Sequence, residues 1–301
     1  MSDTTVVARR RSPIPAPIRA MRPKQWVKNV LVFAAPVAAG MVFQPHVLTH
    51  SLRAFVAFCA VSASIYLIND VRDVESDRQH PKKRLRPIAA GEVSPSLAVG
   101  MAVVLLAGAL ALGFSTTVLL GVVIAVYWVL QVGYSLFAKN QPIIDLAMVA
   151  SGFLLRAVAG GVASGIPLSQ WFLLVASFGS LFMVAGKRYS EMIQLGPDAG
   201  TRASLASYTP TYLRFVWTLS AALVIMSYAL WAFDLRTAAG QWAGIPWAQV
   251  SIAPFTLAMM RYAFGIDKGE AGEPEDAVLG DRTLQVLAVS WAVPVALIFV
   301  R

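Results

Sequence analysis

A row of acidic residues with one amide stands out in the segment NDVRDVESD. Its members are Asn69, Asp70, Asp73 and Asp77, spaced so that a continuous helix would place them on one face. Carboxylates that close repel one another unless a cation joins them, and Mg²⁺ usually takes one or two carboxylates together with phosphate oxygens. The row therefore predicts a Mg²⁺-diphosphate site, at which Asn69, Asp73 and Asp77 hold the metal and Asp70 assists.

Basic residues accompany the acidic row. Arg72 lies within it, and Lys82, Lys83, Arg84 and Arg86 follow it. Guanidinium groups bind phosphate through two parallel hydrogen bonds, and ammonium groups act as point charges. Arg72, Lys83 and Arg84 are therefore candidates for phosphate binding. Charges that only set the topology of a membrane protein would give the same pattern, and the sequence leaves both interpretations of the basic run open.

The segment RPKQWVKN contributes Lys24, Lys28 and Asn29. On an α-helix, Lys24 and Lys28 lie one turn apart and share a face. All three are candidates for contact with the phosphates of a donor or of a lipid acceptor. The same lysines are also typical of side chains that extend toward lipid headgroups beside an interfacial tryptophan, here Trp26.

Charged residues also occur in two later segments. Asp145 and Arg156 share a helix face but are about 16 Å apart along the helix, too far for a direct pair. Charges inside a membrane span usually face the interior of the bundle, where Arg156 either anchors a phosphate or pairs with another helix. The acids of GEPED, residues 272–276, either form a solvated loop or contact ribose hydroxyls above the site.

The elements that carry these residues are apolar segments of membrane-spanning length. Of the 301 residues, 57% are hydrophobic and 14% are charged, whereas soluble domains carry about 25% charged residues. About 20 apolar residues cross a bilayer core. We predict an all-α polytopic membrane protein with nine transmembrane helices, at residues 26–44, 52–69, 96–113, 116–137, 143–164, 170–186, 211–233, 247–265 and 283–300.

The distribution of basic residues predicts the orientation. Lys and Arg gather in cytoplasmic loops, and with the N-terminus inside only Arg53, Arg236 and Arg301 would lie in outer segments. NDVRDVESD and GKRYSE, residues 186–191, would then both face the cytoplasm. We expect residues 1–24 to form a disordered basic cytoplasmic tail. Residues 25–301 would form the membrane domain of a multi-pass cell-membrane protein, surrounded by membrane lipids.

Several classes of function find no support in the composition. The formal net charge of +9 reflects topology rather than nucleic-acid binding, because the chain has no separate basic domain. The single cysteine, Cys59, cannot form an internal disulfide, and the three histidines show no metal-ligand spacing. The sequence leaves open whether the protein forms a homo-oligomer.

The acidic row also carries a family resemblance. NDVRDVESD matches the NDxxDxxxD motif of the UbiA superfamily of intramembrane prenyltransferases, which the chain resembles from about Arg22 onward. The resemblance implies a nine-helix UbiA-like bundle with a Mg²⁺-diphosphate site. Typical members carry a second acidic motif after helix 6, whereas this chain has Lys187, Arg188, Tyr189 and Glu191 there. This departure removes metal ligands and adds donors for a further phosphate.

Together with RPKQWVKN, LRAVAGG, FGSLFMVAGKRYSE and GEPED, the row resembles the decaprenyl-phosphate phosphoribosyltransferase branch of that superfamily. This resemblance implies transfer of phosphoribosyl from 5-phosphoribosyl 1-diphosphate (PRPP) to decaprenyl phosphate, a polyprenyl phosphate lipid, on the way to the arabinose donor of cell-wall arabinan. Mg²⁺ would hold the leaving diphosphate. Lys187, Arg188, Tyr189 and Glu191 would line the donor site.

Two other functions fit parts of the sequence. A prenyltransferase with a small acceptor would use the same acidic row, but the missing second acidic motif argues against it. A transporter would also have apolar spans and intramembrane charges. Transporters commonly contain inverted repeats and broken helices near the midplane, whereas most charges of this chain lie at one membrane face.

Overall fold

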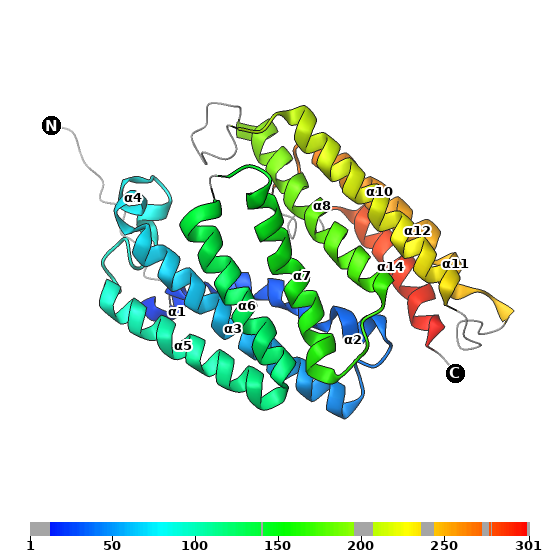
Figure 1. Ribbon diagram of the computed structural model, residues 1–301. Helices are drawn as coiled ribbons and strands as arrows, with labels where there is room; N and C mark the ends of the chain where they lie inside the picture. Colours follow the sequence, from blue (N-terminus) through cyan, green and yellow to red (C-terminus); the bar gives the residue numbers. More distant parts are fainter. Residues whose placement is uncertain are drawn as a thin grey trace.

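The structure is a computed structural model that describes residues 13–139, 141–195, 207–235, 244–272, 277 and 279–299. All regular structure within these residues is helical, which confirms the all-α prediction. The long helices lie side by side, and each packs against its neighbours in the sequence (Figure 1). Helices that follow one another therefore alternate in direction.

The first half of the chain begins with short elements and continues with long helices. These are α1 (Ala16–Ala20), the 3₁₀ helix η1 (Pro23–Phe33), α2 (Ala34–Ala38), α3 (Pro45–Arg72), α4 (Val74–Gln79), the 3₁₀ turn η2 (Lys83–Leu85) and α5 (Pro95–Thr116). Proline opens both α3 and α5, where its missing N–H leaves no intrahelical bond unmade. The Ser94 hydroxyl caps α5 by accepting a hydrogen bond from the amide of Leu97.

The second half consists mostly of long helices. They are α6 (Val118–Gly133) with its π-helical extension η3 (Tyr134–Ala138), α7 (Ile144–Ser164), α8 (Gln170–Leu195), α10 (Pro210–Asp234), α11 (Trp247–Val250), α12 (Ile252–Asp267) and α14 (Arg282–Ile298). Thr117, Thr209 and Asp281 cap α6, α10 and α14 through side-chain oxygens. Polar residues directly before the apolar runs thus set where these helices begin.

Six helices are long and apolar enough to cross a membrane, and they match six of the nine predicted segments. They are Pro45–Arg72, Pro95–Thr116, Val118–Ala138, Ile144–Ser164, Gln170–Gln194 and Pro210–Asp234. The segments predicted at 26–44, 247–265 and 283–300 form shorter helices instead. Because a 3₁₀ helix rises about 2.0 Å per residue, η1 and α2 together still reach about 30 Å, the thickness of a bilayer core.

Part of the predicted tail is ordered. Residues 1–12 lie outside the described residues, but Ala16–Ala20 forms α1, whose Ala20 is buried in an apolar cluster with side chains of α3 and α5. Arg19 also pairs with Glu92, in the turn before α5. The prediction of disorder over residues 1–24 is therefore wrong for this helix, because its apolar side chains pack on the bundle.

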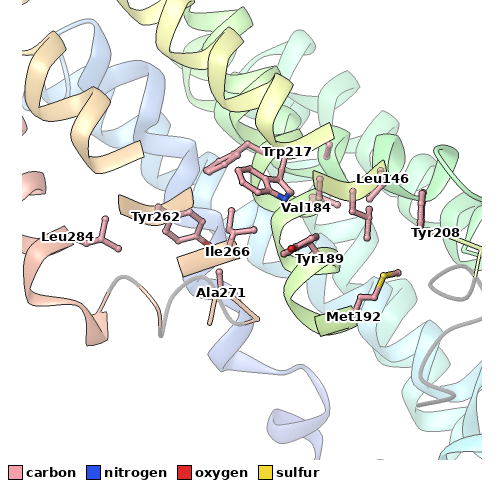
Figure 2. Close-up of a cluster of buried hydrophobic side chains, with 14 residues drawn as sticks. Leu146, Val184, Tyr189, Met192, Tyr208, Trp217, Tyr262, Ile266, Ala271 and Leu284 are labelled. Carbon is pink, nitrogen blue, oxygen red and sulfur yellow. The ribbon is translucent and has the colours of Figure 1, made fainter. Parts of the chain in front are cut away.

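Helix α7 forms a wall shared by two apolar clusters. One cluster lies between α3, α6 and α7 and includes Phe58 and Ile124. The other draws side chains from α7, α8, α10, α12 and α14, among them Tyr189, Trp217 and Ile266 (Figure 2). α7 also contacts η1 and α2. The two clusters hold the helix ends that carry the candidate site residues in fixed positions.

Candidate active site

The polar motifs of the chain lie at one end of the bundle, the end near α4 in Figure 1. The last turns of α3, α8 and α12 lie there together with the first turns of α7, α10 and α14. Asp145 of α7 pairs with Arg188 of α8, and Arg214 of α10 pairs with Asp267 of α12. The predicted acids and bases therefore share one end of the protein, although they come from distant parts of the sequence.

One non-helical residue, Asp73, divides the acidic row between two helices. α3 ends at Arg72, Asp73 has a non-helical backbone conformation, and α4 begins at Val74. Asp70 and Asp77 are buried, whereas Asp73 is partly exposed. The prediction of one continuous helical face is therefore wrong, because Asp73 forms a junction between two helices rather than a turn of one.

Arg86 joins the two buried acids. Its Nη1 lies 3.2 Å from Oδ1 of Asp70 and 2.6 Å from Oδ2 of Asp77. Arg22, which precedes η1, contacts the same oxygen of Asp70. Buried carboxylates need such partners, since an unpaired buried charge is strongly destabilising. The two acids therefore hold the chain before η1 and the loop after α4 against the end of α3.

Asn69 and Asp73 are the members of the row best placed to hold a cation. Oδ1 of Asn69 is buried without a hydrogen-bond partner in the described part of the chain, and Nζ of Lys139 lies 3.5 Å from Oδ1 of Asp73. Among the described residues, no three His, Cys, Asp or Glu side chains are close enough to hold a metal by themselves. Two oxygen ligands fit a Mg²⁺ ion that completes its coordination with phosphate oxygens. Asp77 uses one carboxylate oxygen, Oδ2, for Arg86.

The other bases near the row differ in their surroundings. Lys83 and Arg84 are exposed on η2 and can meet a phosphate from solvent. Arg72 donates hydrogen bonds to the backbone oxygen of Ser135 and, over 3.2 Å, to its hydroxyl. Arg72 thus links α3 to η3, whereas the two bases of η2 keep their charges at the surface.

The segment GKRYSE lies within α8, which continues beyond its predicted end. Lys187 and Arg188 lie 4.0 Å and 3.3 Å from carboxylate oxygens of Glu191. Arg188 is buried, and its Nε lies 3.7 Å from Oδ2 of the buried Asp145. Neither of these two atoms has a hydrogen-bond partner among the described residues. Nε of Arg188 is therefore a buried donor that faces the Asp145 carboxylate without a hydrogen bond to it.

Tyr189 belongs to the apolar cluster of Figure 2. Its hydroxyl accepts a hydrogen bond from Nη2 of Arg214 over 2.6 Å and donates one to Oδ1 of Asp267 over 3.4 Å. Arg214 also pairs directly with Asp267 over 2.8 Å, and more than half of its side chain is exposed. Tyr189 is thus enclosed, and Arg214 provides a solvent-facing cation beside GKRYSE.

Tyr208 holds the first turn of α7 from the chain before α10. Its hydroxyl donates to Oδ1 of Asp145 and accepts from the amide of Ile143, each over 2.5 Å. Burial and, after it, the hydrogen bond to Asp145 raise the pKa of Tyr208 above its ordinary value, so the hydroxyl keeps its proton. Ile143 has a φ of +70°, which is unusual for a β-branched residue, and the bond to Tyr208 helps to hold it there.

Helix η1 buries Asn29 and leaves its lysines nearer the surface. Side chains three positions apart share a face of a 3₁₀ helix, and Asn29 and Val32 are both fully buried. Lys24 is exposed and Lys28 is half-buried. Four positions correspond to a rotation of about 120° beyond one full turn in this conformation. The prediction that the two lysines share a face is therefore wrong, because it assumed an α-helix.

Arg156 is buried among neutral groups of neighbouring helices. Its Nε donates to Oδ1 of Asn29 over 2.8 Å, and its Nη2 donates to the hydroxyl of Tyr127 over 2.5 Å. Its Nη1 donates to the backbone oxygen of Gly152 over 2.8 Å. Of the two interpretations that the sequence left open, these contacts favour pairing with other helices over a phosphate anchor.

Sequence reasoning gave no site role to Lys139, Tyr208 or Arg214, and it placed Arg86 only within the basic run after the acidic row. Arg86 and Lys139 carried a signal, since both are bases at an edge of a predicted span. Nothing in the local sequence connects Tyr208 or Arg214 with α7 or α8. The acids of GEPED, at residues 273–276, lie outside the described residues.

Known proteins resemble the chain over nearly its whole length. The sequence model of the UbiA prenyltransferase family matches residues 31–290. A decaprenyl-phosphate phosphoribosyltransferase from Corynebacterium glutamicum is 56% identical over 282 residues, which cover 91% of this chain and 83% of that protein. Another from Mycobacterium tuberculosis is 50% identical over 296 residues, which cover 97% of this chain and 96% of that protein.

The fold also resembles that of solved structures. A UbiA homolog from Archaeoglobus fulgidus, solved with bound DMAPP and Mg²⁺, has a TM-score of 0.69 and is covered over 98% of its chain, with 94% of this chain matched. The sequence identity between the two is 18%, so this likeness concerns the fold alone. The six apolar helices, together with the match to the UbiA prenyltransferase family, make this chain a multi-pass membrane protein.

Proposed function

The chain belongs to the UbiA prenyltransferase family, and we propose that it is a phosphoribosyltransferase within that family. It transfers the 5-phosphoribosyl group of PRPP to decaprenyl phosphate, giving decaprenylphosphoryl-5-phosphoribose and diphosphate. This is an early step toward the lipid-linked arabinose donor of cell-wall arabinan. The proposal is carried by the 56% and 50% identity with decaprenyl-phosphate phosphoribosyltransferases over 91% and 97% of the chain.

The reaction requires the site to orient the two substrates and to stabilise the charge on the leaving diphosphate. C1 of the ribose loses its bond to the diphosphate, which leaves with the electron pair, and gains a bond to an oxygen of the lipid phosphate. In-line attack converts the α donor into a β product. The lipid phosphate is already an anion, so it needs no strong general base. Catalysis therefore rests mainly on orientation and on electrostatic stabilisation of the leaving group.

The acidic end of α3 is proposed to bind the diphosphate of PRPP. Asn69 and Asp73 would hold Mg²⁺ there, with Asp77 as a further ligand. When bound, the ion neutralises charge that develops on the leaving diphosphate. Lys139, next to Asp73, is near enough to contact the same group. Asp70 has an indirect role, because it pairs with Arg86 and holds that side chain beside these ligands.

The bases at the same end are proposed to bind the remaining phosphates. Lys187, Arg188 and the exposed Arg214 are the donors for the 5-phosphate of PRPP, and their position at the same end of the bundle supports this assignment. Lys24 and Lys28 of η1 are proposed to hold the lipid phosphate, because η1 belongs to a segment of membrane-spanning length. The exposed bases of η2 serve as weaker contacts for phosphates arriving from solvent.

We further propose that nine segments cross the cell membrane with the N-terminus in the cytoplasm. The segments η1–α2, α11–α12 and α14 would complete the six long helices. The excess of basic residues in the segments assigned to the inside supports this orientation. The acidic row would then face the cytoplasm, where soluble PRPP is available.

The test is a transfer assay with the purified protein in detergent, PRPP labelled in the ribose, Mg²⁺ and decaprenyl phosphate. We expect label to enter the lipid fraction, and we expect Asp73→Ala to abolish this transfer. Glu75→Gln is the matched control, because Glu75 lies two residues away but has a side chain that is 77% exposed and pairs with Arg78. That variant should retain wild-type activity.

Two results would contradict the proposal. The first is an absence of labelled lipid in the wild-type reaction. The second is consumption of a prenyl diphosphate with a small acceptor in a reaction without PRPP, which would make the protein a prenyltransferase of the ordinary UbiA kind. Equal loss of activity in Asp73→Ala and Glu75→Gln would contradict the role of the acidic row.

A further inference from the structure

Arg156 lies in an unusual environment for a charged side chain. It is 6% exposed, and its partners are an amide oxygen, a backbone oxygen and hydroxyls. No carboxylate lies within ion-pair distance of it in the described part of the chain. A guanidinium without a buried counter-ion is costly inside a membrane bundle, and such residues are usually functional.

The hydrogen bond from Arg156 to Asn29 connects α7 to η1. Arg156 and Gly160 are four residues apart and share a face of α7, and Gly160 packs directly against the backbone of Val32. Asn29 and Val32 share a face of η1, since a 3₁₀ helix has three residues per turn. The two helices are therefore attached at two successive positions, one through a hydrogen bond and one through close backbone packing.

The other end of η1 is attached to the acidic row. Arg22 contacts Asp70 directly before η1 begins, and its backbone has a φ of +53°, which is unusual for a residue other than glycine. Arg156 and its hydrogen-bond partners lie deeper in the bundle than the acidic row. Ser62 accepts a hydrogen bond from Arg156 over 3.5 Å, and it lies two turns before Asn69 on α3. η1 therefore extends from the acidic row down to Arg156.

We propose that Arg156 is a positioning residue that holds η1, and with it Lys24 and Lys28, in register with the acidic row. Its Nε and Nη2 are both occupied by Asn29 and Tyr127, so it acts through these groups rather than by touching a substrate. Its charge strengthens each of these hydrogen bonds, since bonds from ionised donors are roughly twice as strong as neutral ones. The kinetic part of this inference rests on the proposed function, whereas the structural part does not.

Cys59 offers a built-in reporter for the structural part. It is the single cysteine of the chain, it is 7% exposed, and its sulfur accepts a hydrogen bond from Nδ2 of Asn29 over 3.3 Å. If η1 moves away from α7, the Cys59 thiol becomes exposed. Alkylation requires access to the thiol, so faster alkylation in a variant that disrupts this contact reports its exposure.

The first experiment measures the rate at which N-ethylmaleimide alkylates Cys59 in purified, monodisperse protein. We expect Arg156→Gln and Asn29→Ala each to speed alkylation by about tenfold or more, because each loses a buried charge-assisted hydrogen bond. The double variant should react no faster than the faster single one, because the two side chains act as a unit. Arg53→Gln is the matched control and should react like wild type, since Arg53 lies on the same helix as Cys59 but is exposed.

Each outcome of this experiment either supports or overturns the link between Arg156 and Asn29. Wild-type alkylation in Arg156→Gln, or additive effects in the double variant, would overturn the link between Arg156 and Asn29. Asn29→Ala keeps every charge of the protein, so it tests the link even if Arg156→Gln fails to fold. Wild-type alkylation in folded Asn29→Ala would also overturn the proposal. None of these measurements depends on enzymatic activity, so they stand even if the proposed transfer is not observed.

The second experiment measures steady-state kinetics of phosphoribosyl transfer. We expect Arg156→Gln and Asn29→Ala to raise KM for decaprenyl phosphate more than they lower kcat, because both variants displace the lysines proposed to bind the lipid phosphate. Arg156→Lys should recover part of this loss, since a lysine can still donate to Asn29. A fall in kcat with unchanged KM in both variants, or no recovery by lysine, would show that Arg156 does not position η1 for substrate binding.

Discussion

Replacing Gly160 with alanine is expected to force η1 away from α7. A methyl group at this position would lie 2.9 Å from the carbonyl carbon of Val32 and closer still to its oxygen, and 3.1 Å from Cδ of Pro36. Real Cβ atoms essentially never come within 3.0 Å of another heavy atom in this way. Because the obstacle is backbone rather than the end of a flexible side chain, one of the two helices must move.

The size of the effect follows from this geometry. A carbon atom and a carbonyl oxygen pack at about 3.3–3.6 Å, so the two helices must separate by about 1.5–2 Å at this point. Overpacking of this kind costs about 1–3 kcal/mol of stability. A displacement of about 1 Å in groups that position a substrate can lower the rate about 100-fold. We therefore expect Gly160→Ala to lower Tm and to reduce kcat/KM for transfer about 100-fold.

The assay compares thermal unfolding in detergent and labelled-PRPP transfer for two alanine variants. Gly108→Ala is the matched control, because Gly108 lies inside α5 with no neighbouring atom within 4 Å of an added Cβ. Alanine is favoured over glycine in a helix by about 1 kcal/mol, so this variant should be at least as stable as wild type and fully active. Wild-type Tm and activity in Gly160→Ala would refute the close packing of η1. Equal losses in both variants would assign the effect to helical glycines in general.

Three further predictions concern the polar end. Arg86→Gln should lower the free energy of unfolding by about 3 kcal/mol, because it leaves Asp70 and Asp77 buried without their shared partner; adding Asp77→Asn should recover part of that loss in denaturant titrations. Tyr208→Phe should cost about 1–3 kcal/mol in the same titrations, because it removes the hydroxyl that donates to the buried Asp145; an unchanged midpoint would show that this contact does not stabilise the fold. Chelation of divalent cations with EDTA should abolish transfer, and Mg²⁺ should restore it; full activity in EDTA would exclude a metal at the acidic row.

The long helices could be predicted because their cause is local. A run of about 20 apolar residues in a membrane must satisfy its backbone groups internally, and a helix does so within one segment. The segments predicted at 96–113 and 143–164 accordingly appear as α5 and α7, with ends displaced by a few residues. The boundaries were less predictable at α8, where GKRYSE is polar enough to suggest a loop but continues the helix.

The conformation of η1 could not be predicted from its own residues. PKQWVKNVLVF is compatible with an α-helix, and the sequence was interpreted in that way. In the 3₁₀ conformation Asn29 and Val32 share a face and contact Arg156 and Gly160, more than 120 residues later in the chain. A contact over such a separation leaves no trace in local composition, so the local sequence could not show how the two lysines are placed.

By itself, the sequence determined that this is an all-helical membrane protein with an acidic row and a basic second segment that match one family. The tertiary structure decided which charges meet: Arg86 rather than Lys83 or Arg84 reaches the buried acids, and Arg214 rather than Tyr189 faces solvent. Hydropathy and motifs are properties of neighbouring residues and can be read along the chain. Burial and ion pairing depend on the few ångströms that separate side chains from different helices, and only the packed bundle sets those distances.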